Sequence, residues 1–188
     1  TQYLYNAIHY IRSIFNEVDF DVEILKTVDG YELILNNVFH DVSLWKSCVM
    51  NTERLNHDLL TNYEKVMRLY QHDYLRDEPY TWKENKADRL RILYIKKMYQ
   101  LIDYFIEKDH FETAIYLTLR LQNNYPYLQK NFHYLMILYN EIGDYYNVEK
   151  QYNNLVMLME RRFNKIPIKS IQDWFKNWNK DYSVLVNK

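Results

Sequence analysis

Polar side chains near the start of the chain recur at a spacing that places them on one side of a helix. These residues are Gln2, Asn6, His9 and Ser13. Amide, imidazole and hydroxyl groups contact base edges in DNA grooves, whereas guanidinium and ammonium groups contact phosphates. Arg12 beside this face and Lys26 further along complete a candidate DNA-binding set. For each residue taken singly, a solvated face of an amphipathic helix is the plainer alternative.

The charge of the same region opposes strong DNA binding. Residues 1–45 carry two basic side chains, Arg12 and Lys26, and seven acidic ones. The acidic residues, which bring the formal charge of this region to −5, are Glu17, Asp19, Asp21, Glu23, Asp29, Glu32 and Asp41. Because neutralised phosphates supply most non-specific affinity, we expect this chain to bind DNA weakly or not at all.

Basic residues gather in two other parts of the chain. They are Lys83, Lys86, Arg89, Arg91, Lys96 and Lys97 in one run and Arg161, Arg162, Lys165 and Lys169 in another. Such runs are typical of a solvated helix face, and the alternative is a surface that meets an acidic partner.

Residue types that carry catalysis or metal binding are present without the spacing that either chemistry needs. The histidines are His9, His40, His57, His72, His110 and His133, and no pair has HxxxH, HExxH or Cys–His spacing. Cys48 lies in an apolar run, which favours burial over nucleophilic reactivity. Two glycines are too few for phosphate-binding loops. We therefore predict no catalytic, metal-binding or cofactor-binding residues; an enzyme with a Tyr- and His-lined cleft is a minor alternative.

A repeat of 34 residues organises the second half of the chain. Residues of matching type at this separation are Leu101 and Leu135, Phe105 and Tyr139, Phe111 and Tyr145, Ala114 and Val148, and Leu121 and Leu155. This is the period of a tetratricopeptide (TPR) unit, an antiparallel helix pair that buries its apolar face by stacking on neighbours. Pro126 closes the first copy, whereas Glu160 stands at that position in the second. A recurring set of tyrosines is expected to line the core and grooves: Tyr94, Tyr99, Tyr104, Tyr116, Tyr134, Tyr139, Tyr145 and Tyr152.

The elements that position these residues follow from periodicity and turn signals. Apolar residues at helical spacing predict helices over 1–15, 41–56, 58–71, 81–107 and 168–179, with helix pairs turning at 108–109 and at Gly143. Residues 21–35 alternate with period two around Asp29-Gly30, which predicts a β-hairpin. Leu4, Ile8, Ile11 and Phe15 are the expected buried face of the first helix, as are Leu44, Val49 and Leu55 in the second. Thr81 and Asp109 begin capping-box patterns, and Asp144 is a further expected cap.

Composition agrees with a mainly α protein. The chain has 188 residues, of which 48% are hydrophobic, and it contains only 2 Gly and 3 Pro. Few turn-forming residues favour long helices with short connections. One cysteine excludes an internal disulfide, and no apolar stretch approaches the length of a membrane span. These features predict a cytoplasmic protein.

The first helix and hairpin resemble the second half of an OmpR-type winged helix. The resemblance rests on Ile8-x-x-Ile11-Arg12-x-x-Phe15 and on Gly30-Tyr31-Glu32-Leu33. It implies that residues 1–37 hold the recognition helix and wing, and that the preceding strands and two helices of that domain are encoded upstream of Thr1.

Residues 38–188 resemble the bacterial transcriptional activator domain of SARP-type regulators, a TPR-like module. The matching segments are Asp41-x-x-x-Trp45, the 69–75 segment, Trp82, Arg89-Leu90, Tyr125-Pro126-Tyr127, the 135–143 segment, Gln151-Tyr152-x-x-Leu155 and Pro167. The departures are His72 in place of a turn Gly, Gln129 in place of Glu, and Val148 in place of Ala. His adopts left-handed turn conformations more readily than branched residues do.

The resemblance implies a cytoplasmic, DNA-binding bacterial transcription regulator. Its intact winged helix would read promoter DNA, and its helical module would mediate self-association, for example as a homodimer, or contact a protein such as RNA polymerase. Whether a receiver domain precedes, as in a response regulator, is open. The alternative function is a TPR-like protein-interaction scaffold with no role in DNA binding.

Overall fold

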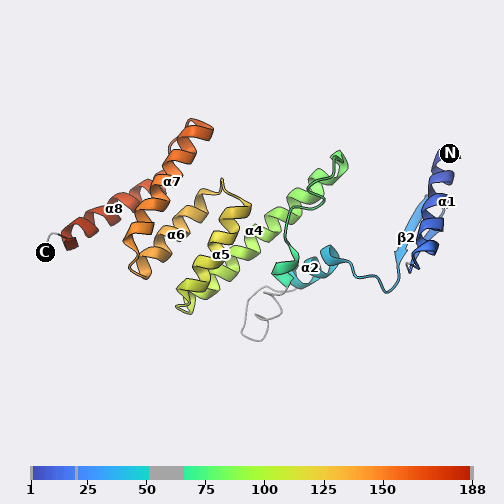
Figure 1. Cartoon of the computed structure of the whole chain (residues 1–188), viewed down its shortest axis with the longest axis horizontal. Helices are drawn as coiled ribbons and strands as arrows, with labels where there is room; N and C mark the ends of the chain where they lie inside the picture. Colours follow the sequence, from blue (N-terminus) through green and yellow to red (C-terminus); the bar gives the residue numbers. More distant parts are fainter. Residues whose placement is uncertain (1, 20, 51–65, 187–188) are drawn as a thin grey trace. The chain divides into compact units, whose positions relative to one another are not determined.

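The computed structural model describes residues 2–19, 21–50 and 66–186, and it is mainly helical with a two-stranded antiparallel hairpin (Figure 1). The mainly α fold class is therefore confirmed at this level. Contacts divide the chain into two compact units, Thr1–Asn51 and Thr52–Lys188. The boundary expected at 37–38 between two domains stays a prediction.

The first unit contains helix α1 (Gln2–Glu17), strands β1 (Val22–Lys26) and β2 (Tyr31–Leu35), and helix α2 (Asp41–Met50). The strands pair in an antiparallel register that places Ile24 opposite Leu33. The Thr27 amide donates to the Gly30 carbonyl across the loop at 2.9 Å. Gly30 has φ +150°, which glycine adopts without strain, so the hairpin predicted around Asp29-Gly30 is confirmed.

The apolar face expected for the first helix is only partly buried. Ile8 is 7% exposed, whereas Leu4 is 56% exposed and Ile11 is 39% exposed. The prediction of a buried face was wrong for those two residues because the hairpin, which α1 contacts through β1, has only two strands and is too narrow to cover a full helical stripe. In α2 Val49 is buried as expected, but Leu44 is exposed and Trp45 is buried in its place. The expected Leu55 lies outside the described residues.

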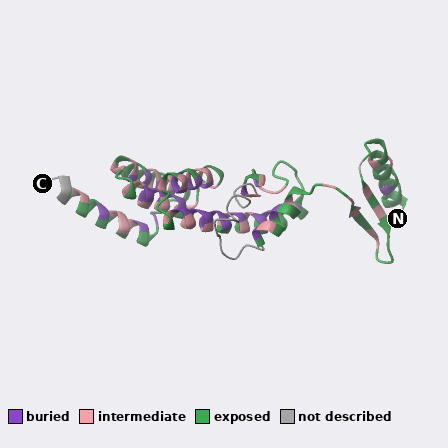
Figure 2. Ribbon diagram, turned by 90° about the horizontal axis from the view of Figure 1, so that it is seen from below, coloured by how far each residue is buried: buried purple, intermediate pink, exposed green. Residues whose placement is uncertain are grey.

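The second unit consists of helices joined by short turns. After residues 66–69, which are helical, and a turn, the 3₁₀ helix η1 (Thr81–Lys83) leads into α4 (Glu84–Glu107). Helices α5 (Phe111–Asn124), α6 (Gln129–Glu141), α7 (Tyr145–Phe163) and α8 (Lys169–Val186) follow. Helix α4 contacts α5, α5 contacts α6, and α6 contacts α7, and buried residues concentrate in these helices (Figure 2). Most of the helix expected over 58–71 lies outside the described residues.

Burial follows the 34-residue period that the sequence shows. The members of three repeat pairs are almost completely buried: Leu101 with Leu135, Ala114 with Val148, and Leu121 with Leu155. In the other two pairs Phe105 is buried, whereas Tyr139, Phe111 and Tyr145 are half-buried.

The turns that end α4 and α6 have the same hydrogen-bond pattern. Asp109 and Gly143, 34 residues apart, both have positive φ, at 57° and 76°. The amides of the following residues, His110 and Asp144, donate to Phe105 and Tyr139 at 2.9 and 2.8 Å. This is the Schellman arrangement, in which a left-handed residue lets the chain return to the last carbonyls of a helix.

The expected caps have mixed outcomes. Asp144 accepts a hydrogen bond from the Asn147 amide at 3.1 Å, as predicted. The capping box at Asp109 was wrong because this residue occupies the left-handed end of α4, and His110 is the N-cap of α5. The capping box at Thr81 was also wrong because Tyr80 precedes the first turn, which places Thr81 inside η1.

The last helix covers the end of this series, as the sequence predicts. Ile171 and Trp178 of α8 join a buried cluster with residues of α6 and α7, namely Phe132, Met136, Val148, Leu155 and Met159. Helix α7 is longer than α5 because Glu160, not proline, occupies the position equivalent to Pro126. Within the described ranges, no helix has both the length and the apolar character to cross a membrane.

Candidate functional site

The predicted DNA-binding residues lie along the surface of α1 and at the end of β1. All but Ser13, which is half-buried, are exposed: Gln2, Asn6, His9, Arg12 and Lys26. The Gln2 amide donates to Asn6 Oδ1 at 3.3 Å, and Ser13 Oγ donates to the Tyr10 carbonyl at 2.8 Å. The structure therefore gathers Gln2, Asn6 and His9 on an accessible helical surface.

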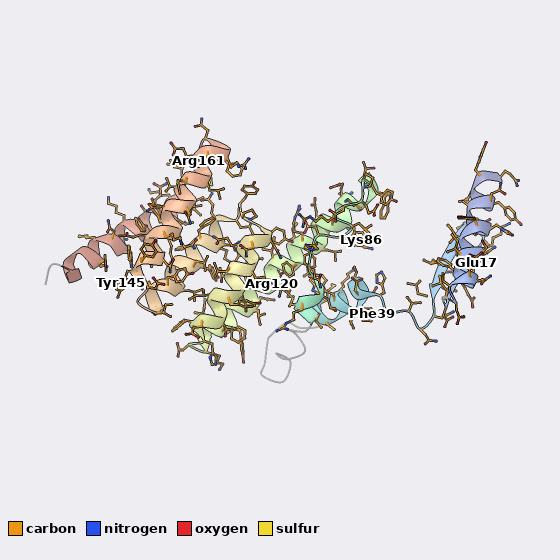
Figure 3. All side chains as sticks on the ribbon, in the orientation of Figure 1. Glu17, Phe39, Lys86, Arg120, Tyr145 and Arg161 are labelled. Atoms are coloured by element: carbon orange, nitrogen blue, oxygen red, sulfur yellow. The ribbon has the colours of Figure 1, made fainter. Side chains whose placement is uncertain are left out.

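Arg12 has a structural role within the first unit. Its guanidinium donates to the carbonyl of Ile24, so it links α1 to β1. Because one Arg12 nitrogen already donates to this carbonyl, fewer of its N–H groups remain to contact a DNA phosphate. The seven acidic residues of residues 1–45 are all exposed, and one of them, Glu17, is labelled at the end of α1 in Figure 3. The surface can offer base-contacting groups, but few phosphate-contacting ones.

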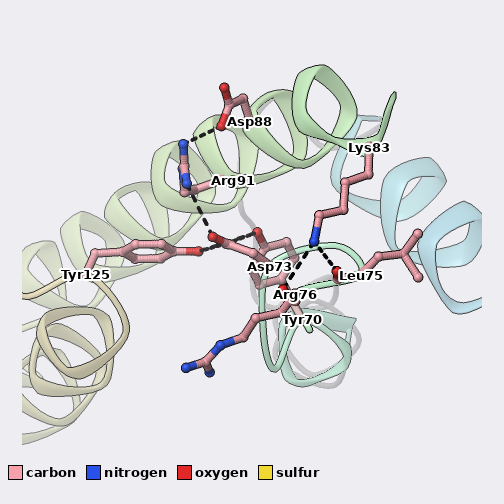
Figure 4. A network of polar contacts seen from close by, with 8 residues as sticks. All are labelled: Tyr70, Asp73, Leu75, Arg76, Lys83, Asp88, Arg91 and Tyr125. Carbon is pink, nitrogen blue, oxygen red and sulfur yellow. Dashed lines mark hydrogen bonds and ion pairs between the residues drawn. The ribbon is translucent and has the colours of Figure 1, made fainter. Parts of the chain in front are cut away.

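A second polar site, which the sequence did not predict, surrounds Asp73 in the second unit (Figure 4). The hydroxyls of Tyr70 and Tyr125 both donate to Asp73 Oδ1, at 2.9 and 2.8 Å. Arg91 Nη1 lies 3.3 Å from Asp73 Oδ2, and Arg91 also pairs with Asp88. We call Tyr70, Asp73, Arg91 and Tyr125 the Asp73 cluster. It joins the segment before α4, α4 itself and the end of α5.

Burial sets the protonation of the tyrosines in this cluster. It raises the pKa of Tyr70 and that of Tyr125 far above the usual value, and the neighbouring Asp73 carboxylate adds to both increases. Both hydroxyls therefore stay protonated and act as donors near neutral pH. Tyr94 stacks on Tyr70 with ring centroids 4.1 Å apart. These features are typical of a cluster that holds helices together, and not of a catalytic acid–base pair.

The hydroxyl of Tyr94 is buried between these elements. No partner within normal hydrogen-bond geometry is found for it among the described residues, although Asn124 lies near enough to lower its pKa against the larger raising effect of burial. The fully buried Tyr94 ring contributes packing area to the core.

The turn beside the Asp73 cluster is held by a buried lysine. Lys83 is 8% exposed, and its ammonium donates to the carbonyls of Leu75 and Arg76. The sequence suggested His72 as the left-handed residue of this turn, but that residue is Leu75, which has φ 51°. The charge-assisted bonds from Lys83 offset the cost of that conformation. Part of the first basic run is thus structural.

A hollow of about 270 Å³ opens next to the cluster. It is lined by Gln71, His72, Asp73, Arg76, Asn123, Asn124 and Tyr125. The Asp73 carboxylate is already engaged by two hydroxyls and Arg91, and most other lining residues are exposed. The hollow is shallow and polar, unlike the mostly apolar pockets that enclose small ligands.

The tyrosines of the repeat divide between core and surface. Tyr94 and Tyr99 are buried, whereas Tyr116 is 64% exposed. Tyr99 donates to Asn131 Oδ1 at 2.6 Å, and Lys130 Nζ lies 4.0 Å from the centre of the Tyr99 ring. Core lining is therefore confirmed for Tyr94 and Tyr99. The hydroxyl of Tyr99 links α4 to α6 through this bond to Asn131.

Histidine and cysteine lie apart from one another. Within residues 2–19, 21–50 and 66–186, no group of three or more His, Cys, Asp or Glu is arranged to hold a metal ion. Cys48 is half-buried in α2. His133 packs edge-on against Trp174, and burial lowers its pKa.

Sequence reasoning missed the Asp73 cluster for a physical reason. A buried tyrosine hydroxyl needs a polar partner, so the sequence can predict that Tyr70 and Tyr125 require one if they are buried. The partner, however, is 52 residues away from Tyr125, and no local pattern identifies it. No protein-family model matches this chain, and no curated protein matches it either.

Proposed function

We propose that this chain is part of a cytoplasmic bacterial transcription regulator that binds DNA. In this proposal residues 1–37 supply the recognition helix and wing of a winged helix. Residues 38–188 form a TPR-like activator module that mediates self-association or contacts the transcription machinery. The observation that carries the proposal is the order of elements: a helix and hairpin precede helix pairs whose left-handed turns recur 34 residues apart, at Asp109 and Gly143.

The DNA-binding part of the proposal is supported by the exposed face of α1. Gln2, Asn6 and His9 present amide and imidazole groups that can contact base edges. The hairpin follows directly, as a wing follows a recognition helix. Because this region is acidic, promoter binding requires the remaining elements of the winged helix in the natural protein to supply phosphate contacts.

The protein-binding part is supported by the second unit. The polar residues of its Asp73 cluster bond to one another and so hold the helices together. Stacked helix pairs expose long surfaces that suit peptide or protein partners. RNA polymerase or a second copy of the chain is the proposed partner, with no cofactor.

The specific alternative is a TPR-like scaffold with no role in DNA binding. Two observations favour it: residues 1–45 are acidic, and Arg12 donates to the Ile24 carbonyl within its own unit. The two functions differ in what the α1 face is for. A regulator needs that face for DNA, whereas a scaffold does not.

Transcript profiling after rapid depletion of the natural protein tests the proposal. A defined set of transcripts should change soon after depletion, and the wild-type protein should restore it. An Asn6→Ala and His9→Ala variant should fail to do so. The matched control changes two exposed residues of α8, Asn177→Ala and Asn179→Ala, and should restore the transcripts. Full restoration by the α1 variant would favour the scaffold, and no early transcript change would contradict the proposed regulator.

A further inference from the structure

An exposed surface that joins apolar and basic side chains lies where α7 ends and α8 begins. Its apolar residues are Phe163, Ile166 and Ile168, which are 46, 74 and 52% exposed. Its basic residues are Arg161, Arg162, Lys165 and Lys169, all exposed, and Figure 3 labels Arg161 near the end of α7. We call this set the α7–α8 surface.

The backbone of this surface is fixed, so its exposed isoleucines are held in place. The Ile168 amide donates to Gln129 Oε1 of α6 at 2.9 Å, and the Lys165 amide donates to the Met159 carbonyl at 3.2 Å. Pro167, between the two isoleucines, is buried. A segment anchored at three points loses little entropy on binding, which favours association.

The surface is hollowed beside Ile166. The hollow has a volume of about 620 Å³ and is lined by Val156, Glu160, Asn164, Lys165 and Ile166. It combines an apolar wall with a lysine, and Glu160 is its one acidic lining residue. An open recess of this kind accepts an apolar side chain while cations at its rim contact neighbouring carboxylates.

The placement of the basic residues is not explained by the helices alone. Arg161 and Arg162 lie in the last turn of α7, where cations favour the helix dipole. Lys169, in contrast, is the first residue of α8, where a cation opposes the dipole. An acidic group from a partner would remove that unfavourable interaction.

We propose that the α7–α8 surface binds an acidic peptide segment of a partner protein, with apolar side chains in the hollow. Charge complementarity supports this partner, since the surface carries four exposed cations and the hollow has one acidic lining residue, Glu160. The hollow and the exposed isoleucines favour a peptide over nucleic acid, whose phosphates need no aliphatic contact. This inference rests on the proposed protein-binding role of the helical module, and it is independent of DNA binding.

Fluorescence anisotropy with the full chain tests the inference. The probe is a fluorescein-labelled 16-residue peptide built from Glu, Leu and Ala (a length of about four helical turns), and the comparators replace every Glu by Lys or every Leu by Ser. Only the Glu and Leu peptide should bind, and more weakly as salt rises. Equal binding of the Lys peptide, or absence of binding by all three, would overturn the proposal.

Variants locate the binding on the chain. Ile166→Ser with Lys165→Ser should raise Kd about tenfold, as loss of a central contact does. The matched control, Ile92→Ser with Arg89→Ser, alters an isoleucine that is 66% exposed and a neighbouring exposed arginine on α4, and should leave Kd unchanged. If the control weakens peptide binding equally, the peptide does not bind at the α7–α8 surface. If the chain binds anionic lipid vesicles or a DNA oligonucleotide more tightly than the peptide, the proposed ligand class is wrong. Circular dichroism of each variant verifies folding. If the chain does not bind the peptide, the proposed function is still tested independently by the transcript experiment.

Discussion

The two Schellman turns have such similar backbones that the aspartate N-cap found after the second turn should also work after the first. His110 begins α5 with φ −87° and ψ 60°, and Asp144 begins α7 with φ −87° and ψ 69°. Asp144 accepts from the amide three residues ahead, at 3.1 Å, whereas His110 makes no such side-chain bond. Because the backbones match, His110→Asp should place a carboxylate where it accepts from the Thr113 amide.

The expected gain follows from measured capping energies. An aspartate cap stabilises a helix by about 1 kcal/mol. The substitution also removes the edge-on contact of His110 with Phe105, whose ring centroids are 6.2 Å apart, at a cost of at most about 0.5 kcal/mol. The net gain is about 0.5–1 kcal/mol. With a urea m-value of about 2 kcal/mol/M, the unfolding midpoint should rise by about 0.3–0.5 M.

The assay is urea unfolding of the full chain, followed by helical circular dichroism. The reciprocal variant, Asp144→His, removes an existing cap and should lower the free energy of unfolding by about 1 kcal/mol. If Asp144→His lowers the midpoint while His110→Asp leaves it unchanged or lowers it, the equivalence of the two turns is refuted.

Three further predictions concern the core, the Asp73 cluster and DNA. Leu135→Ala, at a side chain with no exposed area, should lower the free energy of unfolding by about 2–5 kcal/mol, whereas Ile92→Ala, at a 66% exposed position, should change it by at most about 0.5 kcal/mol in the same urea assay. Burial raises the folded-state pKa of Tyr125 above the unfolded value of 10.0, so the stability that this residue contributes should be fully present below pH 10 and should fall above it. Tyr125→Phe should therefore reduce the fall in the urea midpoint between pH 8 and pH 11. The control Tyr116→Phe, at an exposed position, should not reduce it. This chain should shift DNA weakly or not at all in a low-salt gel assay, and tight binding would contradict the charge argument.

Sequence periodicity predicted several buried positions of the helices because residues 34 apart have matching types. Leu101 and Leu135 are buried for the same reason, as are Ala114 and Val148. The hairpin was also predictable, since Asp29-Gly30 supplies a local turn signal between alternating segments. Local features of this kind need no knowledge of distant contacts.

Features that depend on tertiary contacts were predicted less well. The capping pattern at Asp109 is a plausible helix start, but the end of α4 uses the same residue as its left-handed stop. The apolar face of α1 is readable, yet its burial depends on what covers it, and Leu4 is 56% exposed. The bond from Tyr125 to Asp73 spans 52 residues and has no sequence signal.

Promoter occupancy of the natural protein tests the central claim most directly. Chromatin immunoprecipitation of the tagged protein from its own cells should enrich a limited set of promoter regions over an untagged control. The Asn6→Ala and His9→Ala variant should lose that enrichment while remaining at wild-type abundance. Occupancy equal to the untagged control at every promoter would contradict a DNA-binding regulator.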